Sequence, residues 1–404
     1  MSHEFLNFIL ALVIIIVAAK AGGYISVRLN QPSVLGELLV GLILGPTMLN
    51  MLHTWPMFSA DERLGEAITF MAELGVLLLM MLAGLEMHLP ELLRSGKVSA
   101  LAGGFGIVLP LFLGWGVAIL FGVDTTEALF IGLALAATSV SISAQTLMEM
   151  NVLRSRVGLG LLGAAVFDDI LVILVLSVAF ILVGSTAGGL GSVVITLLSM
   201  IGFLVAASLL GIWLLPRLAD WVDRLPISQG ILAFALVVSL FYSWAAEVIG
   251  GMAAITGAFL VGLFLARTPY KDRIEGGIAA LAYGFFVPIF FVSIGLAVNM
   301  RAIGGEALFF ALVITVVAVL SKIAGGGLGA RIGGFSNRES LQLGIGMVSR
   351  GEVGLIVASF ALSEGLLSAT NYSIVVFIVI VATLLTPPML RASFTSRSPL
   401  KATK

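Results

Sequence analysis

Two neighbouring aspartates, Asp168 and Asp169, lie in an apolar run that otherwise has the composition of a membrane span. A carboxylate at membrane depth is energetically costly, so such groups are rare and usually functional. Each of the two needs a counter-charge, a proton or a metal ion. Carboxylate oxygens suit a hard cation such as Na⁺. A carboxylate that binds either a proton or a small cation exchanges one for the other by competition, and the pair predicts this chemistry.

A lysine elsewhere in the chain can supply the counter-charge, because Lys322 lies in the middle of another apolar span. Adjacent residues on a helix point about 100° apart, so Asp168 and Asp169 cannot both face the same partner. We expect one carboxylate to take Lys322 and the other to face a water-filled cavity. When the paired carboxylate turns to an arriving ion, Lys322 would tend to lose its proton. The alternative is a purely structural ion pair.

Two spans carry polar groups at mid-depth. The span 126–149 holds a hydroxyl cluster, Thr138, Ser139 and Ser141, and the span 339–364 holds Arg350 and Glu352 beside glycines. Such groups can satisfy backbone atoms that unwinding frees, so the two stretches predict a crossed pair of discontinuous helices at a midplane binding site. Ordinary helix packing is the alternative for the serines. We interpret Arg350 and Glu352 as neutralising helix ends and each other.

Three further acids, Glu37, Glu73 and Glu86, lie on the second and third spans. We expect Glu37 and Glu73 to line an entry funnel or to attract cations to it. Glu86 is expected in solvent at the membrane edge.

The composition places these groups in a membrane protein. The chain has 404 residues, of which 60% are hydrophobic and only 11% are charged, and its mean hydropathy is +1.16. Apolar runs of about 20 residues recur from end to end, as in polytopic helical membrane proteins. Cysteine is absent and the three histidines lie at predicted helix ends, which argues against thiol chemistry and against a histidine metal centre. The sequence indicates no cofactor, and its charge pattern indicates no binding of nucleic acid.

The apolar runs predict thirteen spans. They cover residues 5–28, 33–52, 66–87, 98–122, 126–149, 155–184, 191–216, 228–248, 251–267, 275–298, 304–331, 339–364 and 371–392. Lys and Arg concentrate in one set of alternating loops, which predicts a cytoplasmic C-terminus and an external N-terminus. The N-terminus lacks the basic stretch of a secretory signal, so we expect the first span to be retained.

The order of the spans predicts an inverted-topology repeat, in which the seventh span connects the first six to the last six. Equivalent spans are then seven apart, and each pair runs in opposite directions because seven is odd. The span 126–149 pairs with the span 339–364 in this scheme, so the two broken stretches fall at equivalent positions.

Several stretches resemble one known family. Residues 29–46, Leu-Asn-Gln-Pro-Ser-Val-Leu-Gly-Glu-Leu-Leu-Val-Gly-Leu-Ile-Leu-Gly-Pro, closely resemble the second-span signature of the second branch of the monovalent cation:proton antiporters. Phe167-Asp-Asp169 and the stretches 286–296 and 349–355 match further parts of the family. The resemblance covers essentially the whole chain, and the combination of these stretches is specific.

The resemblance implies an all-α polytopic fold of thirteen helices with two discontinuous crossing helices. A dimer domain would comprise residues 1–90 and 225–300, and a core domain residues 91–186 and 301–394. A connector helix would cover residues 187–224, and a cytoplasmic tail residues 395–404. The resemblance also implies a homodimer in the inner (plasma) membrane of a bacterium.

The paired aspartates resemble those of the electrogenic sodium/proton exchangers. In that pattern Asp169 is the principal carrier of cation and proton, and Asp168 pairs with Lys322. Electroneutral relatives carry Asn in place of the first aspartate. Related potassium-efflux antiporters carry Gln there and a long cytoplasmic nucleotide-binding domain, whereas this chain has Asp-Asp and a short tail.

The leading hypothesis is therefore a secondary active transporter that exchanges Na⁺ or Li⁺ for H⁺ by elevator-type alternating access, with competition at Asp169. A K⁺/H⁺ antiporter of the same fold is the first alternative. A cation channel would need a filter-like carbonyl loop, and a membrane enzyme would need a nucleophile motif. Neither feature is visible in the sequence.

Overall fold

Helices make up the regular structure of the part of the chain that the computed structural model describes, residues 3–59, 63–86, 95–183, 189–297, 305–350 and 352–395. The helices of the first half are α1 (His3–Arg28), α2 (Ser33–Leu44), α3 (Met51–Thr54), α4 (Leu64–Leu85), α6 (Gly96–Leu120), α7 (Thr125–Ala136), α8 (Val140–Glu149), α9 (Arg156–Val183) and α10 (Gly189–Trp213). Those of the second half are α11 (Leu215–Asp223), α12 (Gly230–Val248), α13 (Ala254–Leu265), α14 (Lys271–Leu281), η1 (Ala282–Phe286), α15 (Val287–Leu296), α16 (Gly305–Gly333), α17 (Asn337–Gly346), α18 (Glu352–Ser363) and α19 (Ala369–Thr395).

The predicted all-helical membrane fold is confirmed. Within the described ranges, ten helical stretches are long and apolar enough to cross a membrane, and α2 and α13 are shorter apolar helices of 12 residues each. The ends of most predicted spans agree with these helices to within a few residues. The exact count of thirteen spans and the inverted repeat stay predictions, and most of the expected tail, 396–404, lies outside the described residues.

The second predicted span, 33–52, is too long, because α2 ends at Leu44. Gly45 has an extended backbone, with φ −77° and ψ −177°. A residue that precedes a proline is disfavoured in the helical region, and Pro46 follows directly. The chain then turns into the short helix α3.

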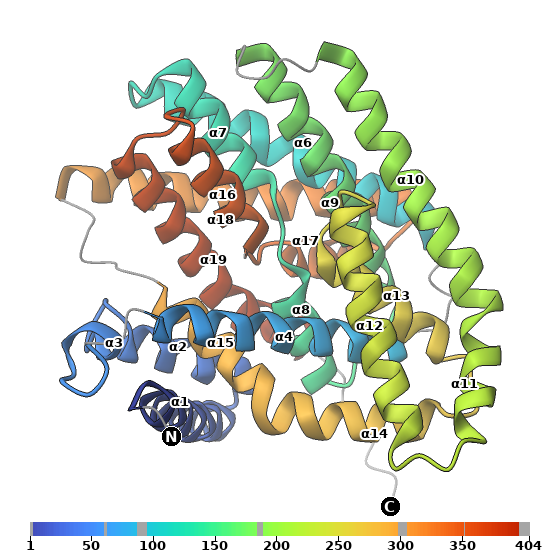
Figure 1. The fold of residues 1–404 in the computed structure, drawn as a ribbon. Helices are drawn as coiled ribbons and strands as arrows, with labels where there is room; N and C mark the ends of the chain where they lie inside the picture. The colour runs from blue at the N-terminus through green and yellow to red at the C-terminus, as the bar shows by residue number, and fades with distance from the viewer. Residues whose placement is uncertain are drawn as a thin grey trace, which may run out of the picture.

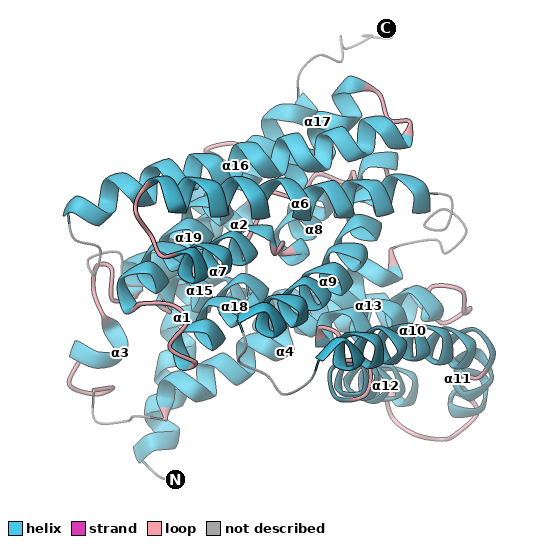
Figure 2. Ribbon diagram, turned by 90° about the horizontal axis from the view of Figure 1, so that it is seen from above, coloured by secondary structure: helices cyan, strands magenta, loops and turns pink. Residues whose placement is uncertain are grey.

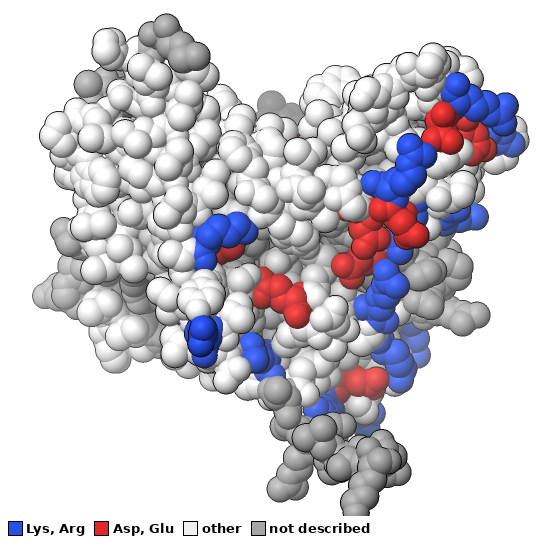
Figure 3. Space-filling view, turned by 90° about the horizontal axis from the view of Figure 1, so that it is seen from below, with Lys and Arg blue, Asp and Glu red and all other residues white. Residues whose placement is uncertain are grey.

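Two groups of helices pack against each other. The core group comprises α6–α9 and α16–α19, and the scaffold group comprises α1–α4 and α12–α15. Figure 1 shows α16, α18 and α19 of the core group above α1, α2 and α15 of the scaffold group. α10 touches α9, α12 and α13, and Figure 2 shows it with α11 and α12 at one end of the molecule. Charged side chains gather in a band along one side of the face drawn in Figure 3.

Small residues bring the helix backbones of each group into direct contact. A Cβ atom on Gly329 of α16 would lie 2.2 Å from the carbonyl oxygen of Leu101 on α6. In the scaffold group, a Cβ atom on Gly262 of α13 would lie 2.1 Å from the carbonyl oxygen of Met81 on α4. Membrane helices associate by such close packing of small residues. Each group is therefore held together by backbone contacts that a larger residue would break.

Candidate functional site

Two helical segments of the core group are interrupted at mid-length. α7 ends at Ala136 and α8 begins at Val140, and the backbone between them is extended, with ψ of 141° at Ala137 and 118° at Ser139. In the second segment α17 ends at Gly346 and α18 begins at Glu352. Both interruptions fall in the stretches where the sequence predicts discontinuous helices.

The two unwound stretches bind each other. The amide of Ser139 donates to the carbonyl oxygen of Ser349 at 2.9 Å. The hydroxyl of Ser349 donates in return to the carbonyl oxygen of Ser139. The hydroxyl of Ser143 donates to the carbonyl oxygen of Gly346 at 2.6 Å and lies 3.0 Å from the hydroxyl of Ser349. The serines thus satisfy backbone groups that the interruptions free, as buried polar groups require.

The aspartate pair lies on α9 and is buried, with 1% of Asp168 and 8% of Asp169 exposed. The two side chains face different parts of the molecule. Asp168 points into the core group, where its Oδ1 atom lies 3.0 Å from Nζ of Lys322. Asp169 lines a cavity beside the scaffold group. This division follows from the angle between adjacent residues on a helix.

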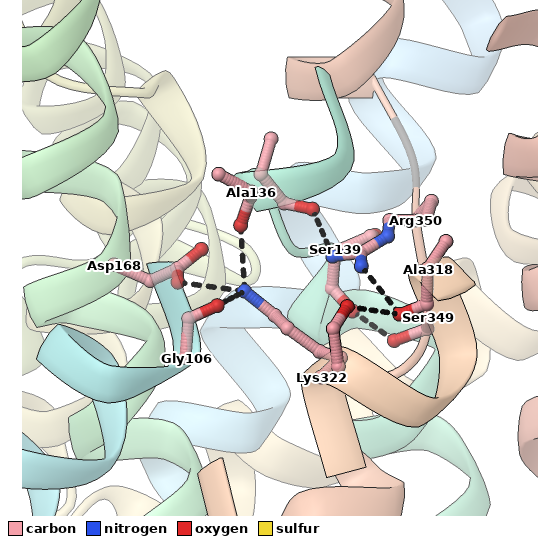
Figure 4. Close-up of polar contacts among 10 residues, drawn as sticks. Gly106, Ala136, Ser139, Asp168, Ala318, Lys322, Ser349 and Arg350 are labelled. Atoms are coloured by element: carbon pink, nitrogen blue, oxygen red, sulfur yellow. Dashed lines mark hydrogen bonds and ion pairs between the residues drawn. The ribbon is translucent and has the colours of Figure 1, made fainter. Parts of the chain in front are cut away.

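Lys322 on α16 is completely buried and fully hydrogen-bonded (Figure 4). Its ammonium group donates to Asp168, to the carbonyl oxygen of Gly106 at 2.7 Å and to that of Ala136 at 2.6 Å. An ammonium group has three protons to donate, so these acceptors satisfy the charge completely. The carbonyl groups belong to α6 and to the last turn of α7.

Arg350 is the second buried cation, and it too lies at the end of α7. Its guanidinium donates to the carbonyl oxygens of Ala137 at 2.6 Å and Ala318 at 3.2 Å, while its own carbonyl accepts from the hydroxyl of Thr383. Cations are stabilised at the C-terminal end of a helix, where unpaired carbonyl groups collect. Glu352 begins α18, but its side chain, like Gly351, lies outside the described residues.

Asp169 faces a small cavity between the two helix groups. The cavity has a volume of about 20 Å³, and its walls come from α4, α8, α9 and α13. This is room for about one water molecule. The hydroxyl of Thr256 on α13 donates to Oδ2 of Asp169 over 3.4 Å, which is a long contact. The carboxylate of the core group therefore touches the scaffold group directly.

Several buried oxygens near the aspartates have no hydrogen-bond partner in the described part of the chain. They are Oδ2 of Asp168, Oγ1 of Thr138 and the hydroxyl oxygens of Ser139 and Ser141. Buried polar atoms nearly always have a partner, so unpartnered oxygens need water or an ion. Hard monovalent cations take oxygen ligands of these types. The arrangement can therefore hold a proton or a small cation beside the interruption of α7 and α8.

A larger cavity of about 630 Å³ lies between the groups, with walls from α4, α9, α12, α13 and α18. Glu73 on α4 and Glu247 on α12 line it, so we call it the acidic cavity. Ile255 lines both this cavity and the small one. Two carboxylates in a water-accessible cleft raise the local concentration of cations. The structure thus places Glu73 where a funnel would need it.

Glu37 is not among the residues that line these two cavities. It is 5% exposed on α2, where it packs beside Gly23 of α1. Glu86, expected in solvent, is half-buried at the end of α4. Burial raises the pKa of the Glu86 carboxyl, and the nearby charge of Arg154 partly offsets that rise. Neither glutamate is brought to the aspartates.

A carboxylate at the end of α8 joins the core group to the scaffold group. Glu149 accepts from the amide of Ser33 at 2.7 Å and from the hydroxyl of the same residue. Gln145 donates to Glu149 at 2.9 Å. Ser33 begins α2, so Glu149 provides negative charge at a helix N-terminus.

Sequence reasoning missed Thr256, Glu247 and Glu149. Glu247 follows Ser243 by four residues on α12, so both lie on one helical face, and this polar spacing is a detectable signal. Thr256 is a single hydroxyl in an apolar helix and gives no signal. Glu149 lies at a predicted span end, where a charge is ordinary.

Comparison with known proteins identifies the family of this chain. The family model described as sodium/hydrogen exchanger, transmembrane, matches residues 9–394. The chain is 39% identical to the Na(+)/H(+)-K(+) antiporter GerN of Bacillus cereus over 98% of this chain and 99% of that protein. It is 37% identical to a Na(+)/H(+) antiporter of Enterococcus hirae over 96% of this chain and 98% of that one.

A solved structure of the sodium proton antiporter MjNhaP1 from Methanocaldococcus jannaschii has the same fold. The TM-score is 0.72 at 18% identity, and the match covers 97% of this chain and 98% of the other.

Proposed function

This chain belongs to the sodium/hydrogen exchanger family, and on that premise we propose that it exchanges Na⁺ or Li⁺ for H⁺ across a membrane. The family and its relatives are transporters and not enzymes. The observation that carries the proposal is the division of the aspartate pair. Asp168 is held by Lys322 inside the core group, while Asp169 faces a cavity at the boundary with the scaffold group.

Asp169 is the shared site for cation and proton in this proposal. Its carboxylate lines the cavity, and Thr138 and Asp168 have buried oxygens without a partner among the described residues that would serve as further ligands. A proton and a cation then compete for one carboxylate. The apparent affinity for Na⁺ should rise with pH, and an affinity that does not depend on pH contradicts competition at a shared site.

Lys322 makes the exchange electrogenic. Its charge is stabilised by Asp168 and two carbonyl groups. When an arriving cation attracts the carboxylate of Asp168, the buried ammonium group loses part of that stabilisation and releases its proton. Asp169 and Lys322 would then release two protons for one cation, so net charge crosses the membrane in each cycle.

Alternating access follows from the two helix groups. In the topology that the Lys and Arg pattern predicts, the acidic cavity faces the outside. On the cytoplasmic side Glu149 joins α8 to the start of α2. We assign this arrangement to an outward-facing state. Movement of the core group as one body would break the contacts of Asp169 with Thr256 and of Glu149 with Ser33, as in an elevator-type transporter with inverted repeats of helices.

The membrane orientation and the dimer are part of the same proposal. The N-terminus lies outside and the C-terminus in the cytoplasm of a bacterium. α1 exposes large apolar side chains, among them Val13 at 52%, Val17 at 64% and Tyr24 at 60%. Such a face suits lipid or a second copy of the scaffold group, and we place the homodimer contact there.

K⁺/H⁺ exchange is the second candidate, because the similar protein GerN is a Na(+)/H(+)-K(+) antiporter. Oxygen ligands bind both ions, so cavity size and rigidity decide between them. Proton flux in proteoliposomes should be titrated with Na⁺, Li⁺ and K⁺ in turn. A response to Na⁺ and Li⁺ at lower concentrations than K⁺ supports the first candidate, and the reverse order supports the second.

The decisive variant is Asp169→Asn. We expect it to abolish cation-dependent proton flux, since an amide neither titrates nor neutralises a cation. The measurement is a pH-sensitive dye inside proteoliposomes. Asp220→Asn on α11 is the matched control, because it makes the same chemical change at an exposed position and should leave flux unchanged. Full flux in the Asp169→Asn protein would rule out the proposed role of this carboxylate.

A further inference from the structure

A second charged cavity lies at the opposite end of the core group from the acidic cavity. It has a volume of about 540 Å³ and is lined by Lys97 of α6, by Arg154 and by Arg156 at the start of α9. The predicted topology assigns this end to the cytoplasm. We call it the basic cavity. Its side chains take no part in the exchange described above.

The positive charge of the basic cavity is poorly compensated. Neither Lys97 nor Arg154 lies within ion-pair distance of an acid among the described residues. Arg156 pairs with Glu339 at 3.3 Å. Two basic residues elsewhere on the predicted cytoplasmic rim have acidic partners. Arg273 pairs with Asp223 at 2.6 Å, and Lys271 pairs with Glu275 at 3.6 Å. What distinguishes this cavity is that three basic side chains line it together, with one ion pair, to Glu339, among the described residues.

Close contacts between distant segments of the chain fix the walls of the cavity. A Cβ atom on Gly333, at the end of α16, would lie 2.8 Å from Cα of Val98 on α6. The guanidinium of Arg156 stacks 5.0 Å from the ring centre of Phe335, a side chain that is 3% exposed. Segments that are distant in the sequence thus meet in backbone and aromatic contacts. The backbone that carries Lys97 and Arg156 is therefore fixed by contacts among α6, α16 and Phe335.

Two helices begin at this cavity, and both add positive potential. α6 begins at Gly96 and α9 at Arg156, so their N-termini lie beside the three basic side chains. Helix N-termini and Arg or Lys side chains together make a favourable environment for a phosphate group. Buried apolar side chains, Val98, Leu159 and Phe335, also line the cavity. An apolar wall beside a basic rim fits a group at the boundary between membrane and water.

We propose that the basic cavity binds a phosphate group, supplied either by the headgroup of an anionic lipid or by free phosphate. The two sources share their chemistry but differ in the membrane, because a lipid also places its acyl chains against the apolar ends of the helices. The site would lie on the core group alone. Its occupant would therefore move with Asp169 in each cycle.

The lipid source is tested by binding of phosphatidylglycerol to the delipidated protein in neutral detergent, measured by native mass spectrometry. Phosphatidylcholine with the same acyl chains is the comparison. Each basic residue near an anionic lipid contributes about a fivefold factor in affinity, so Lys97→Gln with Arg154→Gln should weaken binding roughly 30-fold. The matched control is Arg217→Gln with Arg224→Gln, which removes two charges from the rim beside α11 and should leave affinity within about twofold.

The free-phosphate source is tested by titrating the same proteins with inorganic phosphate at constant ionic strength and measuring the melting temperature. If phosphate raises the melting temperature of the wild type and of the Arg217 and Arg224 double variant but not that of the Lys97 and Arg154 double variant, the site is assigned to free phosphate. Loss of phosphatidylglycerol binding alone assigns it to lipid. Equal binding of both ligands by all three proteins, or equal losses in the two double variants, overturns the proposal.

A second measurement does not depend on the variants folding. Lys97 of the wild-type protein is labelled with an amine-reactive reagent in the presence and absence of each ligand, with Lys271 as the internal reference. A bound phosphate group should protect Lys97 and leave Lys271 unchanged. If neither ligand changes the extent of Lys97 labelling, the proposal is also overturned.

Discussion

Asp168 and Asp169 are adjacent in the chain, yet they face regions with opposite properties. On the Asp168 side, Lys322 donates three hydrogen bonds of 3.0 Å or less, all within the core group. On the Asp169 side the carboxylate lines a cavity and accepts a long contact of 3.4 Å from Thr256 of the scaffold group. The tight side stabilises the buried charge of Lys322 in this state. On the open side the carboxylate lines a cavity at the boundary with the scaffold group.

The difference shows how one helix can combine stability with exchange. A buried charge must be fully hydrogen-bonded to be tolerated, because desolvation is expensive. A transport site has the opposite requirement, since a ligand must leave as easily as it enters. The chain meets both requirements by turning two adjacent residues about 100° apart.

Lys322→Ala should have the largest effect on stability. Removal of one partner of a buried ion pair costs about 3–5 kcal/mol, because it leaves the other charge uncompensated. We expect a clearly lower melting temperature and less charge moved per cycle, measured as current on a solid-supported membrane. The double variant Asp168→Asn with Lys322→Met should recover part of the lost stability, since it leaves neither charge unpaired. An unchanged melting temperature and current in Lys322→Ala would contradict the role of the pair.

Ser349→Ala tests the crossing of the two interruptions. The hydroxyl of Ser349 donates to the carbonyl oxygen of Ser139, and its loss leaves that buried oxygen with one donor fewer. Interhelical hydrogen bonds in membranes contribute roughly 0.6–1.7 kcal/mol each, so we expect a loss of about 1–2 kcal/mol in thermal unfolding. Ser239→Ala is the matched control, because the Ser239 hydroxyl is buried without a partner. A comparable loss of stability in both variants would show that the hydrogen bond from Ser349 to Ser139 contributes no measurable stability.

Thr256→Val tests the open side, where we expect little effect on stability and a measurable effect on exchange. The change keeps the shape of the side chain and removes the donor to Asp169. A carboxylate without this donor holds a proton more tightly, so the cation competes less well. We expect the apparent Na⁺ affinity to weaken about threefold, which corresponds to ~0.6 kcal/mol.

The control for Thr256→Val is Thr315→Val, because the Thr315 hydroxyl is buried and bonds to the carbonyl oxygen of Ala311 within α16. Its apparent Na⁺ affinity should equal that of the wild type. Equal affinities in all three proteins would show that the scaffold group does not act on Asp169.

The smallest effect is expected at the exposed start of α17, far from either side of the pair. The Ser336 amide donates to the Glu339 carboxylate at 2.8 Å and lowers the pKa of that carboxyl. A lowered pKa in the folded state stabilises the protein above the unfolded pKa, and this stabilisation is lost as pH falls through the folded value. Solvent screening limits it to about 0.5 kcal/mol.

Glu339→Gln should therefore lower the melting temperature slightly at neutral pH, and the difference from the wild type should shrink as the pH is lowered from neutral through the pKa of the Glu339 carboxyl. A difference that stays the same over this range would show that the charge of Glu339 is not involved. The hydrogen bond from the Ser336 amide at the start of α17 would then explain the lower melting temperature.

Patterns of residue type predicted much of this molecule. Apolar runs located the spans, because a helix must be apolar over about 20 residues to cross a bilayer. Polar groups in the middle of two runs located the interruptions, since unwound backbone in a membrane needs such partners. Charges at membrane depth singled out Asp168, Asp169, Lys322 and Arg350, because each is too costly to be accidental.

Local rules failed where a proline or a distant partner decided the outcome. The end of α2 at Leu44 was missed because hydropathy alone does not register the effect of Pro46 on Gly45. Arg350 was expected to neutralise a helix end and Glu352; its described partners are the carbonyl oxygens of Ala137, directly after α7, and of Ala318 on α16, and the Glu352 side chain lies outside the described residues. The funnel was expected from Glu37 and Glu73, but the acidic cavity joins Glu73 to Glu247.

The sequence by itself determined which groups carry charge in the membrane and which helices are interrupted, because those properties follow from residue type along a single segment. The tertiary structure decided which aspartate is held and which is open. That choice depends on the rotation of α9 between α16 and α13, which brings Lys322 to one residue and Thr256 to the next. Packing between segments 87 and 154 residues apart sets this rotation, and no local pattern encodes it.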